Sequence, residues 1–139
     1  LRILVIDDEV SILDVLEEFL RSKGHDVTCR ANGADGLSVL HGTKFDLVIS
    51  DIKMAGINGF EFLKLARGID PTLGIVLMTA YEGEYPFSKA LQAGADGYIS
   101  KPFTLNKFSL IFERAYWNAL SRQDWWNDHD DEAQAQAGN

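Results

Sequence analysis

The chain has 139 residues, which favours a single domain, and its hydrophobic share of 46% is ordinary for a globular protein. Its 13 basic and 21 acidic residues give a formal net charge of −8. This charge argues against direct binding to nucleic acid or to an anionic membrane surface, because both depend on Lys and Arg.

Short apolar runs alternate with helical patterns along the first part of the chain. Residues 3–6 form a β-branched run, typical of a strand that is buried on both faces. Apolar residues recur at helical spacing from residue 12 to residue 20, and Lys23-Gly24 ends this helix. The same alternation then predicts a strand at 27–31, a helix at 34–40 and a strand at 45–50.

The alternation continues after a loop that contains Gly56, Asn58 and Gly59. A helix follows at about residues 60–65, and a final helix begins after Thr104, which is a suitable N-cap. The elements predicted between them are a strand at 74–78, a weakly patterned segment at 85–93 that ends at Gly94, and a strand at 97–100.

Five strands alternating with helices predict right-handed crossovers and a parallel sheet covered on both faces. We therefore expect an α/β chain with a flavodoxin-like doubly wound fold, a five-stranded sheet of order 2-1-3-4-5 and five helices. A Rossmann-type fragment fits less well, because it needs a glycine-rich turn after the first strand, where Asp7-Asp8-Glu9 stands.

The composition changes after about residue 120. Residues 121–139 contain Trp125 and Trp126, then a run of acidic residues, then alternating Ala and Gln. We expect one domain over residues 1–120, followed at 121–139 by a C-terminal helix extension and an acidic, polar tail. The single cysteine, Cys29, excludes an intramolecular disulfide, and no apolar run approaches the roughly 20 residues of a membrane span, which predicts a cytoplasmic protein.

Polar side chains stand where the predicted strands end. Asp7 and Asp8 follow the first strand, Asp51 follows the third, Thr79 ends the fourth and Lys101 follows the fifth. Open α/β sheets place their sites beyond the carboxyl ends of the strands, near the point where the strand order reverses. We therefore expect these five side chains to meet at one edge of the sheet.

Such a set suits phosphoryl transfer to an aspartate. Clustered carboxylates repel one another unless a cation lies between them, and their oxygens suit Mg²⁺ or Mn²⁺. An aspartate can attack phosphorus, and the transfer otherwise needs neutralised charge and good positioning. Each residue alone also has a structural interpretation: Asp7 and Asp8 could cap the next helix, and Thr79 and Lys101 could be ordinary strand and surface residues.

Five motifs in order are more specific than any single residue. They are Val5-Ile6-Asp7-Asp8-Glu9, Ser50-Asp51-Ile52-Lys53-Met54, Gly56-Ile57-Asn58-Gly59, Met78-Thr79-Ala80 and Gly97-Tyr98-Ile99-Ser100-Lys101-Pro102-Phe103. With these motifs the chain resembles, over about residues 1–120, the receiver domain of bacterial two-component response regulators. It departs from many relatives at Ala55, where they have proline, and this position has no chemical role.

The resemblance implies a role for each matching residue. Asp51 would accept the phosphoryl group. Asp8 would bind Mg²⁺ directly, Asp7 mostly through water, and Asp51 and the backbone carbonyl of Lys53 would complete the protein ligands. Lys101 would pair with the phosphoryl group, and with Asp51 before it arrives.

The resemblance also implies a switch. Thr79 would bond a phosphoryl oxygen and move inward, and the Tyr98 ring would follow it. The Lys101–Pro102 peptide bond would be cis. Side chains two positions after the acceptor and after the threonine border the phosphoryl group in this family, so we expect Lys53 and Tyr81 to tune its lifetime.

The implied function is a response regulator that receives its phosphoryl group from a histidine kinase or a histidine phosphotransfer protein. It would catalyse only its own phosphorylation and slow dephosphorylation, and would not otherwise be an enzyme. Its output face would be the fourth helix, fifth strand and last helix, which could also form a homodimer. The chain could be the N-terminal receiver fragment of a transcription regulator, with no direct nucleic-acid binding of its own.

Two other functions stay open at this point. A phosphohydrolase with an aspartyl-phosphate intermediate would usually carry a second acid two residues after the nucleophile, where this chain has Lys53. A receiver-like binding module that is never phosphorylated is the other alternative, although the set of Asp8, Asp51, Thr79 and Lys101 speaks against it.

Overall fold

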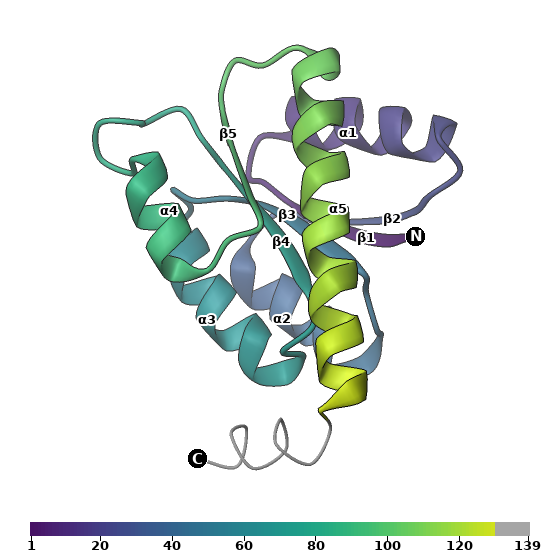
Figure 1. Cartoon of the computed structure of the whole chain (residues 1–139). Coiled ribbons are helices and arrows are strands. Elements are labelled where there is room, and N and C mark those ends of the chain that lie inside the picture. The colour runs from purple at the N-terminus through teal and green to yellow at the C-terminus, as the bar shows by residue number, and fades with distance from the viewer. Residues whose placement is uncertain (130–139) are drawn as a thin grey trace.

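A computed structural model describes residues 1–129 and shows one parallel sheet with helices on both faces (Figure 1). The strand order is β2-β1-β3-β4-β5. The elements in chain order are β1 (Arg2–Ile6), α1 (Val10–Ser22), β2 (Asp26–Arg30), α2 (Gly33–Gly42), β3 (Leu47–Asp51), α3 (Gly59–Ile69), β4 (Gly74–Thr79), α4 (Phe87–Ala93), β5 (Gly97–Ser100) and α5 (Leu105–Asp128). The predicted doubly wound fold, strand order and five helices are confirmed.

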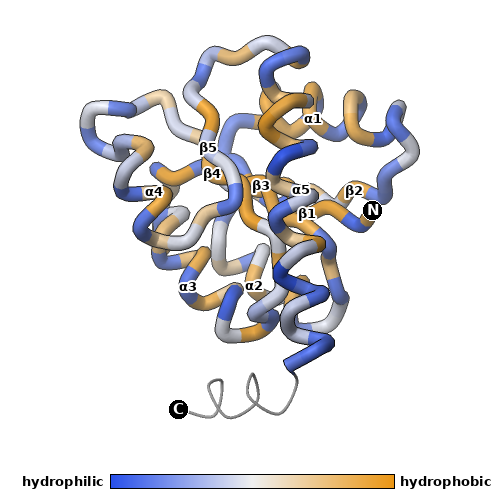
Figure 2. Tube along the Cα trace, viewed as in Figure 1, coloured by the Kyte–Doolittle hydropathy of each residue, from blue (hydrophilic) through white to orange (hydrophobic). Residues whose placement is uncertain are grey.

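The sheet is buried on both faces because successive strand residues point to opposite sides. In β1, Leu4 and Ile6 pack in a cluster with side chains of α2, α3 and α4, whereas Ile3 and Val5 pack with side chains of α1 and α5. The hydropathy-coloured trace is largely apolar along the central strands, and apolar residues recur at intervals along the helices (Figure 2). This double burial explains why the strands read as continuous apolar runs.

The start of α3 lies directly against the end of β3. Asn58 caps α3 by accepting hydrogen bonds from the backbone of Phe60 and Glu61, and the Glu61 side chain completes a capping box. A Cβ on Gly59 would lie 2.7 Å from the carbonyl oxygen of Asp51. Glycine at this position therefore lets α3 approach the strand that carries Asp51.

Helix α5 runs without a break past residue 120 to Asp128, and Thr104 caps its start, as predicted, by accepting a hydrogen bond from the backbone of Lys107. Of the segment 121–139, predicted to be a helix extension and an acidic, polar tail, residues 121–128 belong to α5, and residues 130–139 lie outside the described part of the chain. Within residues 1–129, no helix combines the length and apolar character needed to cross a membrane.

Candidate functional site

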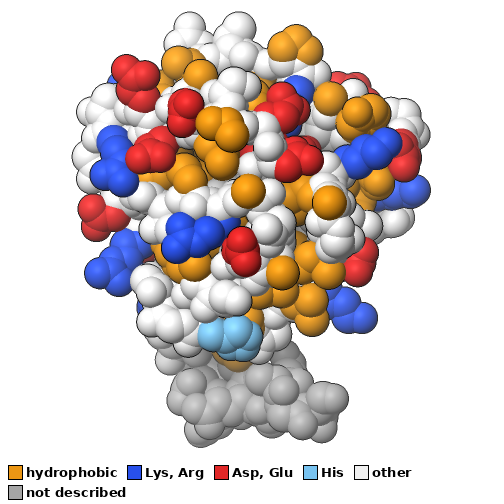
Figure 3. All heavy atoms as spheres, turned by 180° about the vertical axis from the view of Figure 1, so that it is seen from behind, with side chains coloured by type: hydrophobic (Ala, Val, Ile, Leu, Met, Phe, Trp, Pro, Cys, Tyr) orange, Lys and Arg blue, Asp and Glu red, His pale blue; other side chains and the backbone are white. Residues whose placement is uncertain are grey.

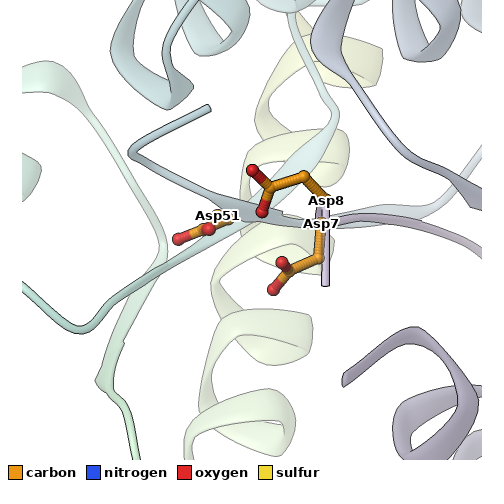
Figure 4. Close-up of side chains that lie close together, drawn as sticks. All are labelled: Asp7, Asp8 and Asp51. Carbon is orange, nitrogen blue, oxygen red and sulfur yellow. The ribbon is translucent and has the colours of Figure 1, made fainter. Parts of the chain in front are cut away.

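Three carboxylates gather at the carboxyl end of β1 and β3. Ligand oxygens of Asp7, Asp8 and Asp51 all lie within 4.8 Å of one another. Figure 4 shows Asp7 and Asp8 reaching from the chain after β1 toward the carboxylate of Asp51 at the end of β3. Asp7 and Asp51 are buried, while Asp8 is exposed. The structure therefore brings together the acids that the strand ends predicted.

Lys101 enters this cluster from the end of β5. Its side chain is only 8% exposed, and its Nζ lies 2.7 Å from Asp7 Oδ2, 3.3 Å from Glu9 Oε1 and 3.4 Å from Asp51 Oδ2. The predicted pair with Asp51 is present, but Asp7 is the nearer partner. The Lys101–Pro102 bond is cis, as expected.

The electrostatics favour a cation between the acids. Burial, and next the charge of Asp7, raise the pKa of Asp51 from 3.8 to about 6. Burial likewise raises the pKa of Asp7, although its hydrogen bond to Lys101 opposes this. Burial alone would lower the pKa of Lys101, but the hydrogen bond to Asp7 and the charges of Asp51, Asp7 and Glu9 outweigh it and raise this pKa.

The hydrogen bonds of Asp7 decide against a simple capping role. Asp7 Oδ1 accepts a hydrogen bond from the backbone N–H of Glu9 at 2.9 Å, and its other oxygen accepts from Lys101. Glu9 itself occupies the N-cap position of α1 and makes no side-chain capping bond. Asp7 therefore orders the turn after β1 and holds a charged partner across the site.

Thr79 and Tyr98 lie on the neighbouring strands β4 and β5. The buried Thr79 hydroxyl accepts a hydrogen bond from the backbone of Tyr81 at 2.9 Å, and this leaves its proton free to donate elsewhere. Tyr98 is partly buried, and its hydroxyl donates to the Tyr85 carbonyl at 2.7 Å. The same loop, between β4 and α4, thus contacts both predicted switch residues.

Lys53 and Tyr81 contact each other. The Lys53 ammonium lies 4.3 Å from the centre of the Tyr81 ring and 3.6 Å from a carboxylate oxygen of Glu84. These contacts join the loop after Asp51 to the loop after Thr79. The sequence placed Lys53 and Tyr81 near the phosphoryl position separately, and the structure adds their mutual contact.

The donor set fits a divalent cation. Asp8 is exposed, so it can bind an ion that keeps several water ligands, and the buried acids supply further hard oxygen atoms. Burial, and next the charge of Asp7, raise the pKa of Asp51 despite the nearby Lys101, so a bound cation would favour its ionised form. The Lys53 carbonyl as a further ligand stays a prediction.

Comparisons with known proteins give the same picture. The family model described as the response regulator receiver domain matches residues 3–113. The chain belongs to the response regulator receiver family. It is a receiver domain of the two-component type, and its membership rests on the fold as well as on the motifs.

Curated relatives of this receiver are transcription regulators. The transcriptional regulatory protein ZraR of Klebsiella oxytoca is 36% identical over 113 residues, which are 81% of this chain and 26% of ZraR. The DNA-binding transcriptional regulator NtrC of Escherichia coli K12 is 37% identical over 111 residues, which are 80% of this chain and 24% of NtrC. The receiver chain thus spans about a quarter of the length of these relatives.

Solved receiver structures share the fold. The CheY-like receiver domain protein of Methanospirillum hungatei JF-1 superposes with a TM-score of 0.79 at 29% identity and covers 86% of this chain and 96% of its own. The response regulator TrrA of Thermotoga maritima, solved in complex with Mg²⁺ and BeF, gives a TM-score of 0.73 at 33% identity, with 82% of this chain and 97% of its own covered.

Two charged residues that contact predicted site residues were not themselves predicted from the sequence. Glu9 contacts Lys101, and Glu84 contacts Lys53. Glu9 directly follows the acid pair at the end of β1, so its position already hinted at a role. Glu84 lies in the loop between β4 and α4, and no motif in the sequence marks it as a site residue.

Proposed function

We propose that this receiver accepts a phosphoryl group on Asp51 and changes conformation in response. The observation that carries the proposal is the environment of Asp51. Its carboxylate lies at the end of β3 within 4.8 Å of ligand oxygens of Asp7 and Asp8, and it has the Lys101 ammonium at 3.4 Å. An Asp51 oxygen would form the new bond to phosphorus as the bond between phosphorus and the donor nitrogen breaks.

The chain's own residues supply most of the positioning. The backbone N–H of Ile52 donates to Asp51 Oδ1 at 3.0 Å, which leaves Oδ2 as the oxygen on the Lys101 side. Mg²⁺, or Mn²⁺, held by Asp7, Asp8 and Asp51 would neutralise charge on the transferring group. Lys101 is already within reach of the acceptor and would pair with a phosphoryl oxygen, while the free hydroxyl proton of Thr79 would donate to another.

The natural donor would be the phosphohistidine of a histidine kinase or of a phosphotransfer protein. The reaction on Asp51 would be the chain's own phosphorylation and slow dephosphorylation, and it would act on no other substrate. A phosphohydrolase is less well supported, because Lys53 stands where the second acid would be and pairs with Glu84. We place the protein in the cytoplasm, where such kinases present their phosphohistidine.

The output face would be formed by α4, β5 and α5. A groove of about 270 Å³ runs between them and is lined by Phe87, Leu91, Tyr98, Ile111 and Asn118 among others. Phe87 and Leu91 are largely exposed, so a second copy of the chain could bury them in a phosphorylation-dependent dimer.

The relatives point to an output in transcription. ZraR and NtrC are named as transcription regulators, and this chain spans about a quarter of each. We infer that the chain acts as the receiver part of such a regulator. On the face shown in Figure 3, basic side chains lie among acidic ones and form no continuous basic patch, which fits a domain that does not itself bind DNA.

The test is incubation with acetyl phosphate and Mg²⁺, read by intact mass. The wild-type chain should gain one phosphoryl group, and Asp51→Asn, or the wild type with a chelator, should gain none. Size-exclusion chromatography of the same samples reports dimer formation. A wild-type chain that stays unmodified would favour the binding module instead.

Lys53 and Tyr81 would tune the lifetime of the phosphoryl group. Side chains at these two positions border the phosphoryl group in the receiver family, and here the Lys53 ammonium lies 4.3 Å from the centre of the Tyr81 ring, so we expect the pair to limit the access of water to a phosphorylated Asp51. Lys53→Ala and Tyr81→Ala should each change the rate of dephosphorylation. If both rates equal that of the wild type, this role is wrong.

A further inference from the structure

Two arginines converge on Asp96 at the end of the sheet opposite to Asp51. Arg67 of α3 and Arg122 of α5 each bind the Asp96 carboxylate, which lies in the turn between α4 and β5. Arg122 binds it with both terminal nitrogens, at 2.9 and 2.8 Å, and Arg67 binds it at 2.9 Å. We refer to Arg67, Asp96 and Arg122 as the arginine clamp.

The carboxylate of the clamp is buried, the side chains of Arg67 and Arg122 are partly buried, and all three are hydrogen-bonded to the backbone. The Asp96 side chain is 4% exposed, and it also accepts the backbone N–H of Ile75 at the start of β4. Both arginines donate to the Leu73 carbonyl, each at 3.0 Å. A buried carboxylate is stable only when it is paired. The bonds to Asp96 therefore hold α3 in place through Arg67 and α5 through Arg122.

Arg122 lies outside residues 3–113, the part of the chain that the receiver family model matches. Close packing supports its contact: a Cβ on Gly74 would lie 2.9 Å from the Ala119 Cβ, and a Cβ on Gly97 would lie 3.5 Å from the Ala115 Cβ. The later turns of α5 are therefore seated on the first residues of β4 and β5. On the outer side of the same helix, Trp117 is 59% exposed.

The clamp also contacts the elements that lead to the phosphoryl site. Arg67 Nη1 donates to the carbonyl of Gly94, the residue that ends α4 in a left-handed conformation. Asp96 directly precedes β5, the strand that carries Tyr98 and leads to Lys101. A shift of α4 or β5 would therefore displace the group that holds Arg122.

We propose that the arginine clamp couples α4 and β5 to the part of α5 beyond residue 113, so that this helix moves with the receiver body. The coupling is a positioning role and includes no chemical step. That the coupling responds to phosphorylation rests on the proposed function of Asp51. The packing of α5 against β4 and β5 does not depend on that function.

The test is hydrogen exchange of the full chain with and without beryllofluoride and Mg²⁺, followed by mass spectrometry. Arg122→Gln removes the charge and the paired bonds, and Arg122→Lys keeps the charge but loses the planar fork. Both variants keep the hydrogen bonds that Arg67 and the Ile75 N–H donate to Asp96, so the domain should still fold. A thermal melt of each variant checks this. Arg114→Gln removes an exposed arginine from the same helix and is the matched control.

Without beryllofluoride, residues 114–128 should exchange roughly ten- to hundredfold faster in Arg122→Gln than in the wild type, and Arg114→Gln should match the wild type. With beryllofluoride, the wild type should change its exchange both in residues 87–100 and in 114–128. The two Arg122 variants should keep the change in residues 87–100 and lose the change in residues 114–128.

The outcomes separate the clamp from the phosphoryl site. Unchanged exchange of 114–128 in Arg122→Gln, or a variant that keeps the full beryllofluoride response in this helix, overturns the coupling. A wild type that responds in 87–100 but not in 114–128 overturns it as well. If beryllofluoride has no effect anywhere, the proposed function of Asp51 fails, and the exchange without beryllofluoride alone then supports or overturns the seating of α5 by the clamp.

Discussion

Replacing Asp51 with Asn should stabilise the fold in the absence of divalent cations. The folded protein raises the pKa of Asp51 from 3.8 to about 6, first by burial and then by the charge of Asp7. Asn keeps the size of the side chain and the oxygen that accepts from Ile52, but carries no charge. The variant therefore avoids the cost of ionising a carboxylate in this site.

The size and sign of the effect follow from the shift. Each pKa unit corresponds to 1.36 kcal/mol, so an ionised Asp51 costs about 3 kcal/mol above pH 6. Between pH 3.8 and about 6, the unfolded chain loses this proton before the folded chain does, so the wild type loses stability as the pH rises through this window. At pH 5 the cost should be roughly half of that at pH 7.5.

The assay is thermal and urea unfolding of both proteins in a chelator at pH 5 and at pH 7.5. At pH 7.5, Asp51→Asn should be more stable by about 1–3 kcal/mol, a rise in Tm of roughly 3 °C or more. The gap should narrow at pH 5, and also when Mg²⁺ is added, because the cation relieves the same repulsion in the wild type.

Asp14→Asn on the exposed side of α1 is the control, since it removes one negative charge from the same domain. It should change the stability by no more than about 0.5 kcal/mol. If Asp51→Asn is no more stable than the wild type at pH 7.5, or if the difference in stability is equal at both pH values, the ionised Asp51 does not destabilise the fold.

Three further predictions concern single contacts. Lys101→Met should tighten Mg²⁺ binding to the unphosphorylated protein by roughly threefold or more, because the ammonium that neutralises Asp7 is gone. Titration calorimetry measures this affinity, and weaker binding would contradict the prediction. Gly59→Ala should lower the free energy of unfolding in urea by about 1–3 kcal/mol, because its Cβ would lie 2.7 Å from the Asp51 carbonyl, and Gly42→Ala, with nothing within 4 Å of its Cβ, is the control. Tyr98→Phe should lose about 0.5–1.5 kcal/mol of stability in the same assay through its bond to the Tyr85 carbonyl, and an unchanged midpoint would argue that water replaces this bond.

The strands were predictable because each is buried on both faces and contains a continuous apolar run. β4, from Gly74 to Thr79, is buried at every residue, and its predicted start was correct. Helix α4 was hard to recognise for the opposite reason. It has only 7 residues, begins after Pro86 without a side-chain cap, and exposes Phe87 and Leu91, so its amphipathic pattern is weak.

The site was predictable in its members but not in its contacts. Strand ends in a parallel sheet meet at one edge, so the positions of Asp7, Asp51 and Lys101 in the chain were enough to group them. That Lys101 lies nearer to Asp7 than to Asp51 is a difference of less than an ångström, which no spacing rule resolves. The arginine clamp joins residues far apart in the chain, and each of its members looks like an ordinary surface charge in the sequence.

Chemical trapping of the modified residue shows whether Asp51 carries the phosphoryl group. The chain is incubated with acetyl phosphate and Mg²⁺ and reduced with borohydride, which converts an aspartyl phosphate to homoserine, and its peptides are then sequenced by mass spectrometry. If Asp51 is the acceptor, homoserine forms at position 51 alone. Homoserine at Asp7 or Asp8, or none in a chain that has gained phosphate, would contradict it.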